Sequence, residues 1–363
     1  MNSAYRPVAV PALYCPFPFR TSPVTDQIDQ GGAEWMERFA LAAAGRRLEY
    51  FRRAHVGRFV GWGVPDGLPG PLQIATNYCN WLFAFDDAVC DERLGGASPG
   101  GLAIYLTRMA RMLETPSVPM LRDDRWAMSL LDIRRELASH ATPAQVYRWV
   151  DQVQDYFTGL VWEAAIRESG RTASVNDYIM MWQKSSATLS ALAFIEVAGG
   201  YVLTAEEVHE PRVHALQDIA AALVGWCNDI VSYNKEAFRA QHFGFPGIQN
   251  LVPVLAHELG CTLDDAARRA VAMHDAAMYR MAGLSEQVRR DAGPALGRYV
   301  DGLCAWVRGS LGWHLTTERY ADPNNPDDPV ARRVAMPTVV TSPTAPIDTA
   351  PLRIPAVAWW WDC

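Results

Sequence analysis

The sequence lacks the cysteine pairs that hold a metal or a disulfide framework. Its seven cysteines are scattered and no two form a Cys-x-x-Cys pair. This excludes a zinc finger or a disulfide-bonded secreted scaffold and favours a reducing compartment, so we expect a cytoplasmic protein. The N-terminal stretch also lacks an uninterrupted apolar run, because prolines punctuate it, and no signal peptide is predicted.

Positive charge and long apolar stretches are also in short supply. Lysine and arginine together number 33 against 40 aspartates and glutamates, a formal net charge of −7. A protein that binds nucleic acid needs the opposite balance to neutralise phosphates, so nucleic acid is excluded as a partner. The longest apolar stretches, such as residues 189–203, contain Glu196 or glycines and fall short of a bilayer span, so no membrane span is predicted.

The sequence does have a strong helical periodicity. Half of its 363 residues are hydrophobic, and from about residue 28 to residue 320 they recur at three- and four-residue spacing. Glycine and proline mark the breaks, and no alternating strand pattern with hairpin turns occurs. These observations predict an all-α fold, a single-domain bundle of roughly ten helices.

Three regions differ in composition. Residues 1–25 are rich in proline and are predicted to form an extended arm, and residues 26–321 contain the helical domain. Residues 322–363 are again rich in proline and are predicted to form a mostly flexible tail. Three of the thirteen tryptophans occupy positions 359–361, where they either dock on the body or a neighbouring molecule or stay disordered.

A cluster of carboxylates marks the end of one strongly apolar helix. Asp86, Asp87, Asp91 and Glu92 lie just before a Gly-Gly pair that stops the helix. The helix dipole places partial negative charge at this end, so acidic residues are unfavourable there, and they also repel one another. A divalent cation reverses both effects, because clustered carboxylate oxygens are ligands that Mg²⁺ prefers. Taken alone, the motif also fits an acidic helix end that continues into a polar loop.

A second set of oxygen donors lies on a later helix. Asn228, Ser232 and Glu236 are four residues apart, which places them in one row over about two helical turns. Their amide, hydroxyl and carboxylate oxygens can hold Mg²⁺ once substrate oxygens complete its octahedron. Lys235 beside them offers a positive charge for a phosphate. An ordinary solvated helix face is the alternative for this run alone, and it accounts poorly for both motifs together.

The two motifs resemble the signatures of the microbial class I terpene synthases, or terpene cyclases. That family carries an aspartate-rich DDxxD or DDxxx(D/E) motif and, later in the chain, the triad (N/D)Dxx(S/T)xx(K/R)E, in the order found here. The resemblance covers about residues 10–320, up to a closing Arg-Tyr pair. It implies a helical bundle around an apolar pocket, and a lyase that ionises an isoprenyl diphosphate with the help of about three Mg²⁺ ions.

The resemblance implies that both motifs contribute to one metal site. The expected metal-binding residues are Asp86, Asp87, Asp91, Asn228, Ser232 and Glu236. Within this set Asp87 and Asp91 are expected to be secondary, orienting basic residues or metal-bound water. The remaining four residues are expected to hold the ions from two opposite walls.

The resemblance also assigns the diphosphate site and part of the pocket. Lys235, Arg319 and Tyr320 are expected to bind the diphosphate group. Phe83 lies one helical turn before the aspartates, and Trp306 matches a pocket tryptophan of the family. Their rings are expected to stabilise a carbocation, although packing in the core would explain either residue as well.

One stretch departs from the family. Members carry an arginine that senses the diphosphate, followed by a helix break whose residues trigger ionisation. The corresponding residues here are Trp182, Ser185 and Ser186, so a tryptophan stands in the place of the arginine and a serine replaces a glycine. Trp182 is predicted to line the pocket. Lys184 could act as the sensor only through a local distortion, because two residues along a helix rotate a side chain by about 200°.

The expected reaction is cyclisation of farnesyl or geranylgeranyl diphosphate to a terpene hydrocarbon or alcohol, with release of diphosphate. Leu82, Ser186 and Ala191 indicate a roomy pocket, which favours these long substrates. Two alternatives remain open. A trans-isoprenyl diphosphate synthase would need a second DDxxD motif in place of residues 228–236, and a degenerate isoprenoid-binding protein is motivated by Trp182. A homodimer is also left open.

Overall fold

Apolar residues at helical spacing give most of the chain the form of helices, which confirms the predicted all-α fold. The structure is a computed structural model that describes residues 7–42, 46–91, 98–118, 120–243, 249–321 and 336–363. Two short strands, β1 (Leu13–Tyr14) and β2 (Val339–Val340), lie near the two ends of the chain. The helices in the described residues are α1 (Thr25–Arg38), α2 (Arg46–Ala54), α3 (Val56–Gly63), α4 (Pro69–Phe85), η1 (Asp86–Asp91), α5 (Pro99–Glu114), α6 (Arg125–His140), α7 (Pro143–Ser169), α8 (Val175–Ser185), α9 (Thr188–Gly199), α10 (Ala205–His209), α11 (Pro211–Phe243), α12 (Leu251–Leu259), α13 (Leu263–Asp291), α14 (Pro294–Thr316), α15 (Glu318–Ala321), α16 (Pro355–Ala358) and η2 (Trp359–Trp361).

Local sequence explains where the helices around the site begin and end. α7 starts with a capping box between Thr142 and Gln145, which satisfies backbone N–H groups of the first turn. It ends at Gly170, whose φ of 63° is a conformation that glycine adopts without a steric penalty from Cβ. α4 has Pro69 at its start, where a missing N–H costs nothing. At its other end α4 continues directly into η1, a π-helix with a wider turn.

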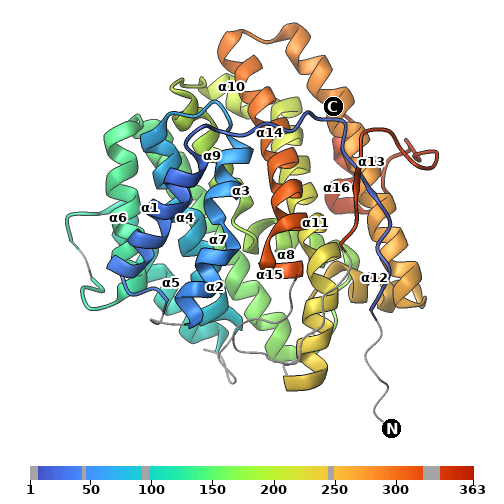
Figure 1. The fold of residues 1–363 in the computed structure, drawn as a ribbon, viewed down its shortest axis with the longest axis horizontal. Helices are drawn as coiled ribbons and strands as arrows, with labels where there is room; N and C mark the ends of the chain where they lie inside the picture. Colours follow the sequence, from blue (N-terminus) through green and yellow to red (C-terminus); the bar gives the residue numbers. More distant parts are fainter. Residues whose placement is uncertain (1–6, 43–45, 92–97, 119, 244–248, 322–335) are drawn as a thin grey trace.

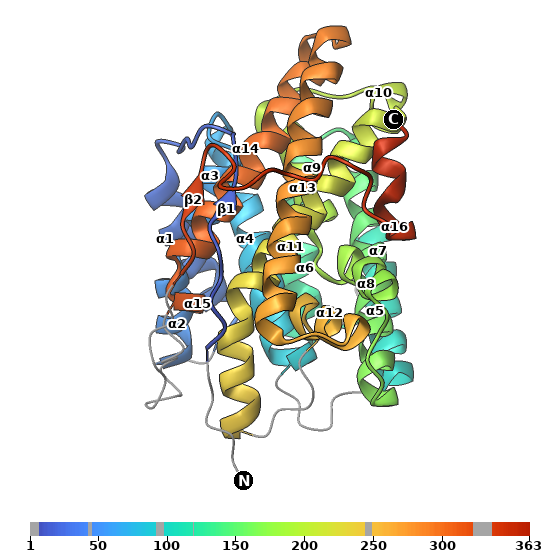
Figure 2. The same cartoon turned by 90° about the vertical axis from the view of Figure 1, so that its right-hand side faces the viewer.

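The long helices run side by side as a bundle (Figures 1 and 2). α9 lies at its centre, because it packs against α4, α7, α11 and α14. α3 packs on α14, and α8 packs on α7, α11 and α12. The core between them contains fully buried aromatic side chains such as Trp81, Trp149 and Trp306. Among the described residues, no helix combines the length and the apolar character needed to cross a bilayer.

The N-terminal arm and the C-terminal segment meet in a small sheet. β1 and β2 pair in parallel, with Leu13 opposite Val339, and Leu13 is fully buried. Figure 2 shows the chain continuing from β2 across the bundle to α16. Residues 336–363 are therefore ordered on the helical body, and the prediction of a flexible tail is wrong for them. Residues 322–335 lie outside the described part.

The terminal tryptophans anchor this segment. The side chain of Trp360 is fully buried, and its indole N–H donates a hydrogen bond of 2.8 Å to Asp218 of α11. Arg280 of α13 donates to the backbone oxygens of Trp360 and Cys363, both at 2.8 Å. Of the two alternatives left open for these tryptophans, the structure shows docking on the body. Composition could not reveal this, because the partners lie far away in the sequence.

We predict that Trp360→Ala lowers the free energy of unfolding by about 3–5 kcal/mol, because it leaves a cavity and an unpaired buried carboxyl at Asp218. Trp361→Ala, at a half-buried position, is the matched control and should cost clearly less. Chemical denaturation followed by circular dichroism measures both. Equal, small losses for the two variants would mean that the docked segment does not stabilise the body.

Candidate active site

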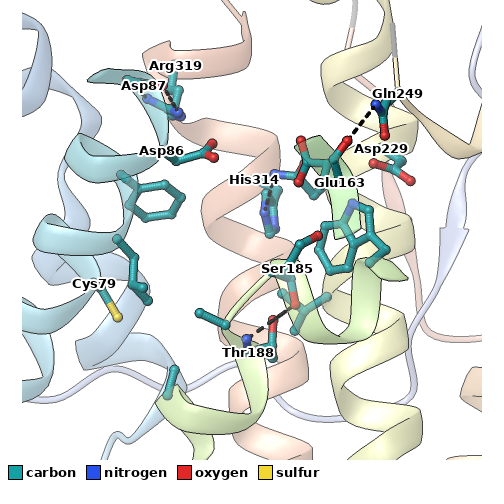
Figure 3. Close-up of a pocket in the computed structure, with 18 of the residues that line it drawn as sticks. Cys79, Asp86, Asp87, Glu163, Ser185, Thr188, Asp229, Gln249, His314 and Arg319 are labelled. Atoms are coloured by element: carbon teal, nitrogen blue, oxygen red, sulfur yellow. Dashed lines mark hydrogen bonds and ion pairs between the residues drawn. The ribbon is translucent and has the colours of Figure 1, made fainter. Parts of the chain in front are cut away.

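A cavity of about 300 Å³ lies among α4, η1, α7, α8, α11 and α14. Figure 3 shows that its charged side chains gather at one end, with Asp86, Asp87 and Arg319 on one side and Glu163, Asp229 and Gln249 on the other. Cys79, Ser185 and Thr188 lie at the opposite end. The cavity is thus polar at one end, and apolar and aromatic side chains such as Phe59, Leu82 and Val224 line the rest of its wall.

The aspartate motif lies on the π-helical turn that follows α4. α4 contains no acidic residue and is mostly buried up to its last residue, Phe85. The first two residues of η1, Asp86 and Asp87, are acidic and border the cavity. The carboxylate of Asp86 points into the cavity (Figure 3). Asp91 ends η1, and its side chain lies outside the described part. The π-helical turn itself was not predicted from the sequence.

Asp87 forms a bidentate ion pair with Arg319 of α15. The two guanidinium nitrogens Nη1 and Nη2 donate to the two carboxylate oxygens at 2.8 and 2.6 Å. Both side chains are largely buried, with 13% and 7% of the side-chain surface exposed. Arg319 also donates to the hydroxyl of Tyr50 at 3.1 Å. Asp87 therefore holds a basic residue in place, and its secondary role at a metal site stays a prediction.

The second motif lies on α11, as its spacing predicts. Asn228 and Glu236 border the cavity, and the carboxylate of Glu236 accepts a hydrogen bond of 3.1 Å from Asn250. Ser232, one turn from each, is buried but does not border the cavity, and its Oγ has no hydrogen-bond partner among the described residues. Lys235 borders the cavity, with its Nζ 5.4 Å from the centre of the Tyr320 ring.

His314 of α14 and Tyr320 of α15 orient the amide of Asn228. Its Nδ2 donates to the hydroxyl of Tyr320 at 2.8 Å and lies 3.4 Å from Nε2 of His314. Burial lowers the pKa of His314 to about 3, so the imidazole is neutral and this nitrogen can accept. Both contacts engage the amide nitrogen, so the amide oxygen of Asn228 is available for a cation.

Asp229 follows Asn228 directly in α11, and its side chain is buried. Its carboxylate accepts hydrogen bonds from the hydroxyl of Tyr178 at 2.8 Å and from the backbone N–H of Leu251 at 3.0 Å. The neighbouring side chain of Trp182 counts among the groups that lower the pKa of this carboxyl. Burial and the neighbouring Glu236 raise the pKa of Asp229 well above its usual range. Asp229 therefore joins α8, α11 and α12 at the wall of the cavity.

Ser185 and Ser186, which are expected at a helix break, lie at the break between α8 and α9. α8 ends at Ser185, and α9 starts at Thr188 after Ala187, whose φ of 56° is a left-handed conformation that is strained for alanine. The Ser186 hydroxyl donates to Thr188 Oγ1 at 3.0 Å. Ser185 and Ser186 both border the cavity. The structure thus places these two residues where the resemblance implies.

Trp182 borders the cavity, and its ring fills the space left by a glycine on α11. A Cβ at Gly225 would lie only 2.1 Å from the ring, so the close packing of the indole on α11 requires glycine there. Lys184 does not border the cavity, because its Nζ pairs with Asp155 at 2.7 Å. The local distortion that would turn Lys184 into the cavity is therefore absent from this structure.

Aromatic rings form one side of the cavity. Phe83 and Trp306 both border it, and Phe59 lies between them, with ring centres 6.1 Å from Phe83 and 5.3 Å from Trp306. The guanidinium of Arg319 lies 5.1 Å from the centre of the Phe83 ring. Phe59 was not predicted for the site. Its helix carries no polar motif, so its position depends on how α3 packs on α14.

Several polar residues of the site were also missed. Arg167, Glu163 and Gln249 border the cavity, as do Asp229 and His314. Of these five residues, only Asp229 could have been predicted from the sequence, since it follows Asn228 within the triad motif. The other four come from helix faces and loops whose approach to the cavity depends on tertiary packing.

Known proteins match both the sequence and the fold of this chain. Residues 77–280 match the family model described as terpene synthase family 2, C-terminal metal binding. The chain belongs to the terpene synthase family. A germacradien-6-ol synthase of Streptomyces pratensis is 34% identical over 99% of both chains. A 4-epi-cubebol synthase of Streptosporangium roseum, named for cyclising (2E,6E)-farnesyl diphosphate, is 33% identical over 87% of this chain and 94% of its own length.

A solved structure supports the same assignment. The 2-methylisoborneol synthase of Streptomyces coelicolor, crystallised with Mg²⁺ and 2-fluoroneryl diphosphate, superposes with a TM-score of 0.75 at 25% identity, covering 86% of this chain and 98% of that one. The expected family, fold and reaction class are thereby confirmed. This terpene synthase is a lyase that cyclises an isoprenyl diphosphate, and its metal-binding domain implies a divalent metal ion.

We predict that Asp87→Asn lowers the free energy of unfolding by about 3–5 kcal/mol, because it leaves the buried guanidinium of Arg319 without its carboxylate partner. The control is Asp66→Asn, the same chemical change in an ion pair with Arg20 whose side chains are 68% and 54% exposed. That change should cost about 0–1 kcal/mol. Urea denaturation of the enzyme without ligands measures both, and equal losses would contradict the structural role of the buried pair.

Proposed function

We propose that this terpene synthase binds Mg²⁺ between η1 and α11, at the polar end of the cavity, and cyclises farnesyl diphosphate to a terpene hydrocarbon or alcohol. The observation that carries the proposal is the placement of the oxygen donors. Asp86 on η1 and Asn228 and Glu236 on α11 reach the same end of one cavity from two separate helices. The diphosphate would bind between them, and the isoprenyl chain would extend into the apolar part.

The residues present fit a magnesium site. They offer carboxylate, amide and hydroxyl oxygens, the hard ligands that Mg²⁺ prefers. The buried Oγ of Ser232 has no hydrogen-bond partner among the described residues, and a cation would satisfy it. The bound ions, about three in number, would supply the Lewis acidity that stabilises the leaving diphosphate. Asp86, Asn228, Ser232 and Glu236 would hold them, with Asp87 turned towards Arg319 instead.

Three side chains are placed to bind the diphosphate. Lys235, Arg319 and Tyr320 lie near one another, since the ring centre of Tyr320 is 5.4 Å from Nζ of Lys235 and 6.0 Å from the guanidinium carbon of Arg319. Arg319 is preorganised by Asp87, and Tyr320 by Asn228, so neither side chain has to be ordered when the substrate arrives. All three border the cavity.

The remainder of the cavity suits a carbocation. Phe83 and Trp306 would present their rings to the positive charge, an interaction worth ~2 kcal/mol or more where water is excluded. Trp182 would contribute its ring from α8. Ser185 and Ser186, at the strained break after α8, would contact the substrate where ionisation begins. The apolar lining would keep loose water away from the reactive intermediate.

Farnesyl diphosphate is proposed as the substrate because one relative is named for cyclising it, and that relative is 33% identical. Geranylgeranyl diphosphate is the second candidate, since Leu82 and Ala191 border the cavity and leave room there. A trans-isoprenyl diphosphate synthase is disfavoured by the absence of a second DDxxD motif. The cytoplasmic location and the homodimer stay predictions.

We predict that the purified protein with Mg²⁺ converts farnesyl diphosphate to a cyclic terpene hydrocarbon or alcohol, identified by gas chromatography with mass spectrometry. Geranyl and geranylgeranyl diphosphate are offered in parallel. Preference for geranylgeranyl diphosphate would correct the chain length alone. Longer diphosphates as products would indicate the synthase alternative, and no turnover of any substrate would indicate a binding protein.

We predict that Asn228→Ala and Glu236→Gln each reduce turnover by at least about 100-fold, because each removes an oxygen ligand that a magnesium ion needs. Glu286→Gln, the same charge change at an exposed position on α13, should leave turnover unchanged. Circular dichroism checks that all three variants keep their helices. Turnover near the wild-type rate in both site variants would refute the metal assignment.

A further inference from the structure

The wall formed by α8 offers no positive charge to a diphosphate. Lys184 is the one basic residue in α8, and its Nζ is paired with Asp155 outside the cavity. Trp182 borders the cavity with an indole, which carries no charge. Arg319 of α15 lies on the opposite side of the cavity, where it pairs with Asp87.

The neighbouring helix α7 does bring a cation to this wall. Arg167 borders the cavity one helical turn after Glu163. Figure 3 shows Glu163 beside Gln249 and Asp229, across from the pair of Asp87 and Arg319. α7 is fixed against α8 by a very close approach, since a Cβ at Gly159 would lie 2.3 Å from the backbone nitrogen of Ser185. The position of α7, and with it that of Arg167, is therefore fixed relative to α8.

Arg167 is only loosely engaged by the protein. Its Nη1 lies 3.4 Å from Oε1 of Glu163, longer than a well-formed hydrogen bond, and the structure gives it no other ion-pair partner among the described residues. The two side chains are 28% and 17% exposed. This contrasts with Arg319, whose guanidinium is held by two short bonds to Asp87.

We propose that Arg167 binds the diphosphate of the substrate from the α7 side and supplies the charge that α8 lacks. The planar guanidinium presents parallel N–H donors that match two phosphate oxygens, and a long contact with Glu163 is easily exchanged for them. The inference rests on the proposed function, because it takes the diphosphate to lie at the polar end of the cavity. With Arg167, basic side chains reach that end from both sides.

The test measures binding of inorganic diphosphate in the presence of Mg²⁺ by isothermal titration calorimetry, together with steady-state turnover of farnesyl diphosphate. Arg167→Gln and Arg167→Met, which keeps the apolar stem, should weaken diphosphate binding at least about 10-fold, the effect of losing a charge-assisted hydrogen bond. Arg167→Lys should recover part of the affinity. Arg171→Gln removes the same charge at an exposed position outside the cavity and should bind as the wild type does.

Diphosphate affinity at the wild-type level in Arg167→Gln or Arg167→Met would overturn the inference and leave Arg167 as a structural partner of Glu163. An equal loss in Arg171→Gln would overturn it too, because the effect would then be one of net charge. Failure of the proposed function looks different. The wild type would then turn over no isoprenyl diphosphate, whatever the variants do to the binding of inorganic diphosphate.

Discussion

Repulsion between like charges at the polar end of the cavity is the constraint on which the site depends. Asp86 on η1 and Glu236 on α11 bring carboxylates to that end, and Asp229 and Glu163 add two more acidic groups to its wall. Burial and Glu236 already hold the pKa of Asp229 well above its usual range. Such a concentration of acidic groups is costly in an apolar bundle unless cations lie among them. In the proposed site, bound divalent ions and an anionic substrate between them would resolve this repulsion together.

The C-terminal part of the helical domain connects the two walls. Arg319 pairs with Asp87 on the aspartate side, and the next residue, Tyr320, accepts a hydrogen bond from Asn228 on the α11 side. One short helix, α15, thus fixes a residue of each motif. The same two side chains border the cavity, so the contacts that hold the walls also set the position of the groups that would bind the diphosphate.

Those parts of the site that depend on local geometry could be predicted from the sequence. Helical spacing placed Asn228, Ser232 and Glu236 on one face of α11, and the order of the two motifs indicated the fold and the family. The remaining features depend on contacts between distant segments. The role of Asp87 as the partner of Arg319 is one example, and Arg167 and His314 at the cavity wall are others. The docking of Trp360 on Asp218 is long-range as well, so proline-rich composition misled the prediction of the tail.

In the proposed site, metal ions and a diphosphate bind between η1 and α11. Crystals grown with Mn²⁺, a substitute for Mg²⁺ with an anomalous signal, and inorganic diphosphate test this most directly. We expect anomalous peaks coordinated by Asp86 on one side and by Asn228, Ser232 and Glu236 on the other, with the diphosphate between them. Diphosphate bound without metal, or metal peaks away from both walls, would contradict it.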